Sequence, residues 1–150
     1  MSNNARITFN TYISTVVLPT LPAGWTFSTA DSFPITLADK TLSIKWVTGS
    51  MRGFTVDTRI RMCQLEIFIG SSATEEAELA ADQILNTMRI NSGQNPLLII
   101  PNLDWTVSPA VPIGTQLTIK PQSPGWNPID GPSDQDRLYI LTLLIDYTPG

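Results

Sequence analysis

The 150-residue sequence contains no histidine and only one cysteine, and these two shortages exclude most familiar catalytic and metal-binding chemistry. Without imidazole the chain cannot build a Ser-His-Asp triad, a histidine general base or a histidine metal site. Cys63 has no partner for a disulfide, and its place inside a strand-like segment predicts a buried, unreactive thiol. We therefore expect a protein that is not an enzyme, with an enzyme that uses carboxylates alone as the weakest alternative.

Long apolar runs are also missing. The most apolar stretches, PLLIIP and LTLLI, are too short to cross a bilayer, and no basic segment followed by an apolar one opens the chain. We expect a soluble protein made in the cytosol, without membrane contact. The net charge of -4 argues against a nucleic-acid binder that relies on a broad basic surface.

Cofactor and metal motifs are absent as well. Neither GxGxxG nor GxxxxGK[ST] occurs, so the known phosphate-binding loops are excluded and no cofactor is expected. Glu75, Glu76, Glu78 and Asp82 crowd one helical segment, but their spacing directs them away from its apolar stripe and indicates a solvated face. PIDGPSDQD lacks the ligand spacing of an EF-hand, which leaves calcium binding there as a weak alternative to no metal at all.

Two segments have helical periodicity. The first begins at Asn3 or Asn4, ends at Pro19, and places Phe9, Tyr12, Ile13, Val16 and Val17 on one face. The second begins with the capping-box pair Ser72 and Glu75 and is expected to stop near Gly93. Its apolar stripe consists of Ala77, Ala80, Ala81, Ile84, Leu85 and Met88.

Strand patterns outnumber these helices. They cover residues 25–27, 41–47, 59–69, 96–101, 104–108, 115–120 and 137–147, and in 59–69 the odd positions from Cys63 to Ile69 form the core face. The order helix, strands, helix, strands predicts a single α+β domain over residues 1–150. We expect a mostly antiparallel β-sheet with two amphipathic helices packed on it.

Two segments, residues 49–58 and 121–136, fit neither pattern and are expected to be long loops. The first has two glycines together with Arg52 and Phe54, and the second has four prolines and two glycines around Trp126. Long loops in compact domains are usually functional or disordered. A tryptophan in such a loop is exposed unless something covers it, so we predict Trp126 as an interface anchor.

Charge is divided along the chain. Residues 40–61 have five basic residues, including Arg52, Arg59 and Arg61, against the single acid Asp57, whereas the second helix starts with Glu75 and Glu78 among its acids. Two solvated surfaces explain this division most simply. The sharper hypothesis is that the basic patch of one copy meets the acidic patch of the next, which closes into a ring if the rotation permits.

The order of elements along the chain resembles that of the tail terminator (tail completion) proteins of long-tailed bacteriophages. The resemblance depends on three segments: LPAGWTF after the first helix, the strand RIRMCQLEIFIG, and AELAADQIL in the helix that follows. The proline-rich stretch 121–136 is longer than this pattern requires. The resemblance implies a structural virion protein that forms a hexameric ring on the tail tube, stops its polymerisation and provides the docking surface for the head-tail connector or stopper protein.

The resemblance also gives the loop 49–58 a role as an interaction loop, with Arg52 and Phe54 as its contact residues. DNA is expected to pass through the lumen of the ring without specific binding, which an acidic protein favours because it does not hold phosphates. Two alternatives remain open: another neck component, such as a head completion or stopper protein, and a monomeric protein-binding domain that uses Trp126.

Overall fold

The computed structural model describes residues 3–30, 40–46, 52–53, 59–69, 74–88, 98–121, 126–130 and 137–147. Its helical elements are α1 (Asn3–Tyr12), which continues as a π-helical segment (Ile13–Val17) and a 3-10 turn (Leu18–Thr20), and α2 (Thr74–Met88). Its strands are β1 (Thr26–Ala30), β2 (Thr41–Trp46), β3 (Arg52–Gly53), β4 (Arg59–Ile69), β5 (Leu98–Asp104), β6 (Val111–Pro121), β7 (Asn127–Asp130) and β8 (Arg137–Tyr147).

The strands form one sheet in the order β1-β2-β4-β8-β6-β5, with β3 paired to β4 and β7 paired to β8. β1 runs parallel to β2, and the other pairs are antiparallel. The long strands β4 and β8 pair over their full length at the centre. The α+β fold with a mostly antiparallel sheet and two helices, predicted from the sequence, is confirmed.

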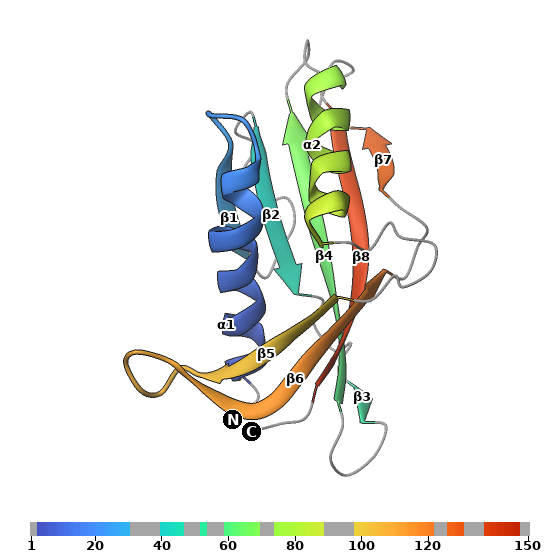
Figure 1. Cartoon of the computed structure of the whole chain (residues 1–150). Helices are drawn as coiled ribbons and strands as arrows, with labels where there is room; N and C mark the ends of the chain where they lie inside the picture. Colours follow the sequence, from blue (N-terminus) through green and yellow to red (C-terminus); the bar gives the residue numbers. More distant parts are fainter. Residues whose placement is uncertain are drawn as a thin grey trace.

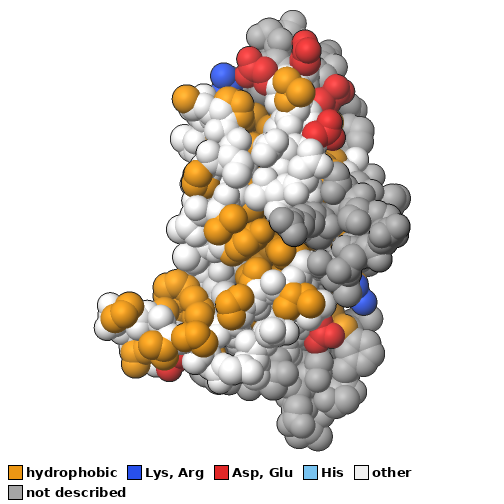
Figure 2. Space-filling model, viewed as in Figure 1, with side chains coloured by type: hydrophobic (Ala, Val, Ile, Leu, Met, Phe, Trp, Pro, Cys, Tyr) orange, Lys and Arg blue, Asp and Glu red, His pale blue; other side chains and the backbone are white. Residues whose placement is uncertain are grey.

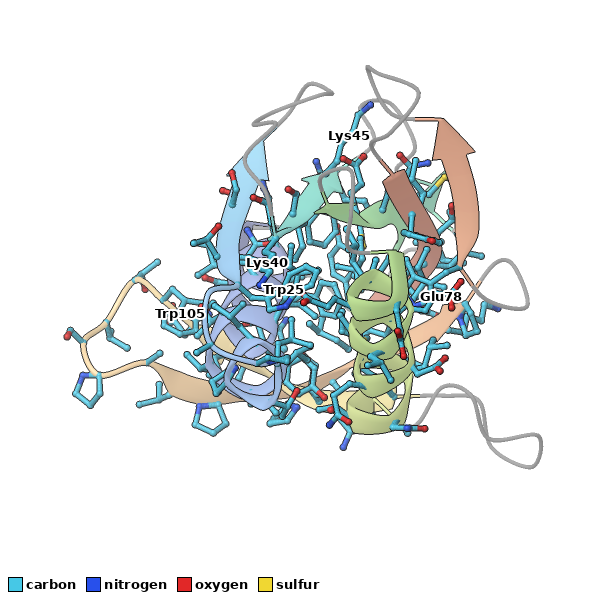
Figure 3. The ribbon with its side chains drawn as sticks, turned by 90° about the horizontal axis from the view of Figure 1, so that it is seen from above. Trp25, Lys40, Lys45, Glu78 and Trp105 are labelled. Atoms are coloured by element: carbon cyan, nitrogen blue, oxygen red, sulfur yellow. The ribbon has the colours of Figure 1, made fainter. Side chains whose placement is uncertain are left out.

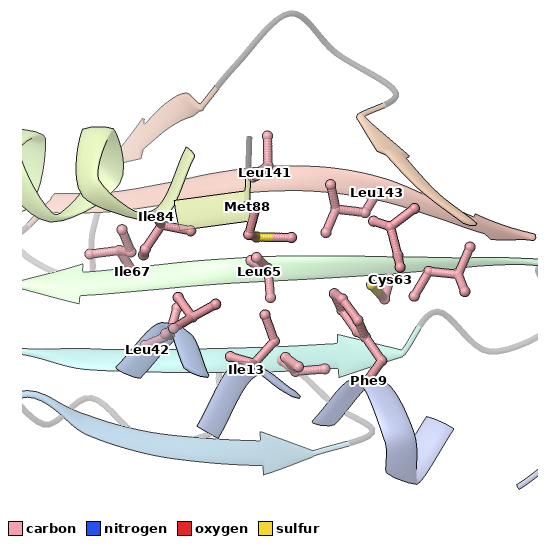
Figure 4. Close-up of a cluster of buried hydrophobic side chains, with 14 of the residues drawn as sticks. Phe9, Ile13, Leu42, Cys63, Leu65, Ile67, Ile84, Met88, Leu141 and Leu143 are labelled. Atoms are coloured by element: carbon pink, nitrogen blue, oxygen red, sulfur yellow. The ribbon is translucent and has the colours of Figure 1, made fainter. Parts of the chain in front are cut away.

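Both helices lie on the same face of this sheet, α1 over β1 and β2 and α2 over β4 and β8 (Figure 1). The hydrophobic core fills the space between the sheet and the two helices. There the sheet residues Leu42, Leu65 and Leu141 meet side chains from the helices (Figure 4). The alternation predicted for β4 is confirmed at Cys63, Leu65 and Ile67, which are fully buried, while the side chain of Ile69 lies outside the described residues. The Arg61 side chain lies on the same, helix-facing side of β4 as these buried residues.

The buried apolar residues of the first helical segment recur at every fourth position and form one row: Ala5, Phe9, Ile13, Val17 and Leu21. In an α-helix of 3.6 residues per turn such a row drifts by about 40° per step around the axis. The wider π turn, in which Leu18 N–H bonds to the Ile13 carbonyl, corrects this drift. The predicted apolar face was therefore wrong at Val16, whose side chain is 45% exposed.

Candidate interaction surface

The predicted loop 49–58 is only partly within the described residues. Arg52 belongs to the short strand β3, opposite Ile60 of β4, so this part of the segment is sheet and not loop. Arg59 starts β4 opposite Tyr147. The side chains of Arg52 and Arg59, and the whole of Phe54, lie outside the described residues.

Two of the predicted basic residues have partners within their own chain. The Arg61 guanidinium carbon lies 5.1 Å from the centroid of the Trp46 ring, a cation–π contact on the helix-facing side of the sheet. Lys40 Nζ lies 3.1 Å from Glu76 Oε2 on α2. One residue of the basic segment and one of the acidic segment therefore pair within the same chain at this point.

The acidic residues of α2 form a solvated face, as predicted. Glu75, Glu76, Glu78 and Asp82 are exposed, and Figure 3 shows Glu78 on the outer side of the helix. Within the described ranges, no group of three or more histidine, cysteine or acidic side chains could hold a metal ion. No helix in the same ranges is long and apolar enough to cross a membrane.

Trp126 is not the exposed side chain that its loop suggested. Its ring is half-buried and packs against the core, and its indole Nε1 donates a hydrogen bond of 3.1 Å to the carbonyl of Ala81 on α2. Residues 127–130 then form β7, which pairs with β8. Part of the segment 121–136 therefore belongs to the sheet, and the hydrogen bond of Trp126 connects the segment to α2.

Two titratable groups are buried on opposite faces of β4. Burial raises the pKa of the Cys63 thiol, which agrees with the predicted inert cysteine. Burial also raises the pKa of Glu66 to about 7, opposed by the nearby charge of Lys45, and among the described residues Glu66 Oε1 has no hydrogen-bond partner. Lys45 points away from the helices (Figure 3), so this charged pair lies on the opposite side of the sheet from the core.

An apolar groove of about 340 Å³ runs between α1 with its π-helical continuation and strand β5. We call it the α1–β5 groove. Its lining residues are Thr8, Thr11, Tyr12, Thr15, Val16, Ile100, Pro101, Leu103 and Trp105. All of them are uncharged. Sequence reasoning did not find this groove.

The Thr8 hydroxyl holds the two walls of the groove together. It accepts hydrogen bonds from Leu103 N–H at 3.2 Å and from Trp105 Nε1 at 2.9 Å, and it donates to Asn102 Oδ1 at 3.2 Å. One donor and two acceptors are the full capacity of a hydroxyl. Asn4 Oδ1 adds a bond from Trp105 N–H at 3.1 Å. The buried polar residues Asn4, Thr8 and Asn102 therefore fix the end of β5 against α1.

Beyond this junction the β5–β6 hairpin projects from the body of the protein (Figure 1). The sequence pattern predicted a strand over residues 104–108, but only Asp104 belongs to β5, and residues 105–109 form turns and bends. Asp104 Oδ1 accepts hydrogen bonds from both Thr106 N–H (2.9 Å) and Thr106 Oγ1 (2.6 Å), and this local turn replaces the strand pairing. These bonds also lower the pKa of Asp104.

The end of the hairpin, residues 106–112, is named here the hairpin tip. It exposes Val107 to 47% and Val111 to 46%, and Figure 2 shows apolar side chains gathered on this projection. A register shift between Pro101 and Leu103, with Gly114 at φ +98° on the facing strand, separates the tip from the base of the hairpin. Glycine adopts this left-handed backbone without strain.

The tip and most of the groove come from two charge-free parts of the sequence. No Asp, Glu, Lys or Arg occurs in residues 7–30 or 105–119, in a chain that has 22 such residues (9 basic and 13 acidic). This gap in charge was the signal that could have indicated the surface from the sequence. Interface cores are depleted of charged residues in the same way.

Comparison with known proteins gives a likeness of fold. No protein-family model matches the chain, and no curated protein matches it in sequence. Among solved structures, it is similar to a chain of the structure entitled "Virion of native gene transfer agent (GTA) particle", with a TM-score of 0.54 and 10% sequence identity. The match covers 97% of this chain and 94% of the other, so the two share their fold over nearly their whole length.

Proposed function

We propose that the protein is a structural component of a virion, and specifically a tail terminator that closes the end of a phage-type tail tube. The observation that carries this proposal is the likeness of fold to a chain of a gene transfer agent virion over 97% of the sequence. The element order that resembles the tail terminators, derived from the sequence, supports the same role independently of that likeness.

The described surfaces suit a protein that binds other proteins and performs no chemistry. The cysteine is buried, and the carboxylates of α2 stand in solvent. The α1–β5 groove is lined by uncharged residues, which favours protein contacts over contacts with nucleic acid, because phosphate binding depends on lysine and arginine. We propose a homohexameric ring, without cofactor or catalytic activity, whose lumen passes DNA without binding it specifically.

The proposed partners are the tail tube protein on one side of the ring and the head-tail connector or stopper protein on the other. Arg52, Phe54 and Arg59 remain proposed contact residues of the segment 49–61. Arg61 is a poor choice for a charge-reversal test, because a carboxylate at this position would replace its cation–π contact with Trp46 and disturb the fold.

Glu75 and Glu78 are better positions for testing charge pairing between copies, since both are exposed. If the acidic face of α2 meets basic residues of a neighbour, the double variant Glu75→Lys and Glu78→Lys weakens ring formation and leaves the thermal unfolding temperature within a few degrees. Equal assembly by the double variant and the wild type removes this pairing from the proposal.

The experiment that tests the function is tube growth. Purified tail tube protein is polymerised with and without the chain, and tube lengths and ends are recorded by electron microscopy. A terminator shortens the tubes in proportion to its concentration and leaves extra density at one end. Tubes of unchanged length with bare ends contradict the terminator role, and binding to connector particles without any effect on tubes favours another neck component.

A further inference from the structure

We propose that the hairpin tip of one copy docks in the α1–β5 groove of a second copy, so that the chains join head to tail. This inference rests on the proposed ring and names the contact that would build it. The same chain supplies both parts of this contact, the hairpin tip and the α1–β5 groove, and the residues of both are uncharged.

The hairpin tip has the character of a docking element. Val107 and Val111 are each almost half exposed, and Pro109 and Pro112 are exposed beside them. Loops that only connect strands are usually polar, and exposed apolar patches mark interaction sites. The tip therefore gains free energy when another apolar surface removes it from water.

The groove is already formed in the single chain. Its walls are joined through the saturated Thr8 hydroxyl, and the Trp105 ring lies beside α1 where the hairpin leaves the body (Figure 3). Val16, which the π turn brings out of the core, stands at the edge of the groove with 45% exposure. A pre-formed groove binds its partner without the cost of ordering new side chains.

A chain cannot place its own tip in its own groove. Trp105 is at the base of the hairpin loop and also lines the groove, whereas the tip continues outward from the body (Figure 1). The contact is therefore between copies, and it joins two different surfaces. A contact of this heterologous kind leaves one free tip and one free groove in every pair, and it closes into a ring when the rotation permits.

Electrostatics permits a second copy as the occupant and gives a strongly charged partner no advantage. Two chains of net charge -4 repel each other, most strongly where the exposed acids of α2 approach. The charge-free segments 7–30 and 105–119 supply the tip and most of the groove, so their residues add no like-charge pair to the contact. Asp104, which stands between the lining residues Leu103 and Trp105 and bonds to Thr106 of the tip, is an acidic neighbour of both surfaces. A strongly charged partner would find no opposite charge in the groove.

The test uses three lysine variants with matched exposure. Val107→Lys changes the tip and Val16→Lys the groove. The control is Ile99→Lys, because the Ile99 side chain on β5 is apolar and 53% exposed and belongs neither to the groove lining nor to the tip. Each variant adds one positive charge, which changes the net charge from -4 to -3 and so weakens general repulsion between copies. Any loss of association therefore comes from the altered surface. Thr15→Lys, at another exposed groove position, replaces Val16→Lys if that variant unfolds at a lower temperature.

Association is measured by sedimentation velocity over a range of concentrations, and at tube ends by electron microscopy. We expect Val107→Lys and Val16→Lys to raise the dissociation constant at least about 30-fold, because each buries a charge in an apolar contact. Ile99→Lys should behave as the wild type. An equal mixture of the first two variants should form dimers and nothing larger, since one retains an intact groove and the other an intact tip.

The outcomes separate this contact from the proposed function. If Val107→Lys or Val16→Lys associates and caps tube ends as well as the wild type, or if their mixture stays monomeric while the wild type assembles, the contact is overturned and the terminator role stands. If the groove instead receives the tube protein, the wild type is monomeric in solution and Val107→Lys still caps tubes, which also overturns the contact. A wild type that neither associates nor caps overturns both.

Discussion

Replacing Thr8 by valine removes one hydroxyl and leaves the shape of the side chain almost unchanged. Leu103 N–H and Trp105 Nε1–H then lose their acceptor, and Asn102 Oδ1 loses its donor. An unsatisfied buried polar group costs about 1–3 kcal/mol. Leu103 and Trp105 are half-buried and can recover water, so we take the low end for their two N–H groups. Asn102 is buried, but a carbonyl oxygen that loses a donor is tolerated better than an orphaned N–H, so we take the low end there too and expect a loss of about 3 kcal/mol in all.

For a domain of this size that loss corresponds to a fall of about 6–12 °C in the unfolding temperature, measured by circular dichroism or calorimetry. The matched control is Thr15→Val, because the Thr15 hydroxyl is exposed and bonds only locally, to the carbonyl of Thr11 at 2.6 Å. Its effect should stay within about 0.5 kcal/mol. Hydrogen exchange at the amides of Leu103 and Trp105 should also accelerate in Thr8→Val. Equal stability of the two variants would refute the idea that Thr8 holds the hairpin against α1.

Three further predictions concern buried groups. The raised pKa of Glu66, about 7 against 4.5 for the free side chain, means that the folded state binds a proton more tightly than the unfolded state, so stability is full below about pH 4.5 and falls as the pH rises to 7. Glu66→Gln should therefore stabilise the protein by roughly 2 kcal/mol at pH 8 and hardly at pH 4, as urea unfolding at the two pH values will report. Trp126→Phe removes the bond to the Ala81 carbonyl and should cost about 1 kcal/mol in the same assay. Cys63 should react with a thiol reagent only when the chain is unfolded, and fast reaction of the native protein would contradict its burial.

Periodicity in the sequence predicted the central elements because their residues are sorted by burial. The bounds of β4 and β8 agree with the prediction, and the α2 stripe from Ala77 to Met88 lies in the core. These segments follow one period over their whole length. Where the backbone departs from a period the prediction failed, as at Val16, which the π turn rotates out of the core.

The candidate site was harder to derive because its parts are distant in the sequence. Thr8 and Trp105 are 97 positions apart, and nothing in either local pattern indicates that they bond. What covers Trp126 could not be derived for a related reason, since the carbonyl that its indole reaches belongs to α2, 45 positions away. The useful signal was the absence of charge over residues 7–30 and 105–119, which requires no knowledge of contacts.

Whether this chain forms a ring on the end of a tail tube can be seen by electron microscopy of purified tail tubes incubated with the protein, with end-on averages of the capped ends. We expect a closed ring of six copies at one end of each tube, which the Ile99→Lys variant also forms and Val107→Lys does not. Bare ends, or single copies scattered along the tube walls, would contradict it.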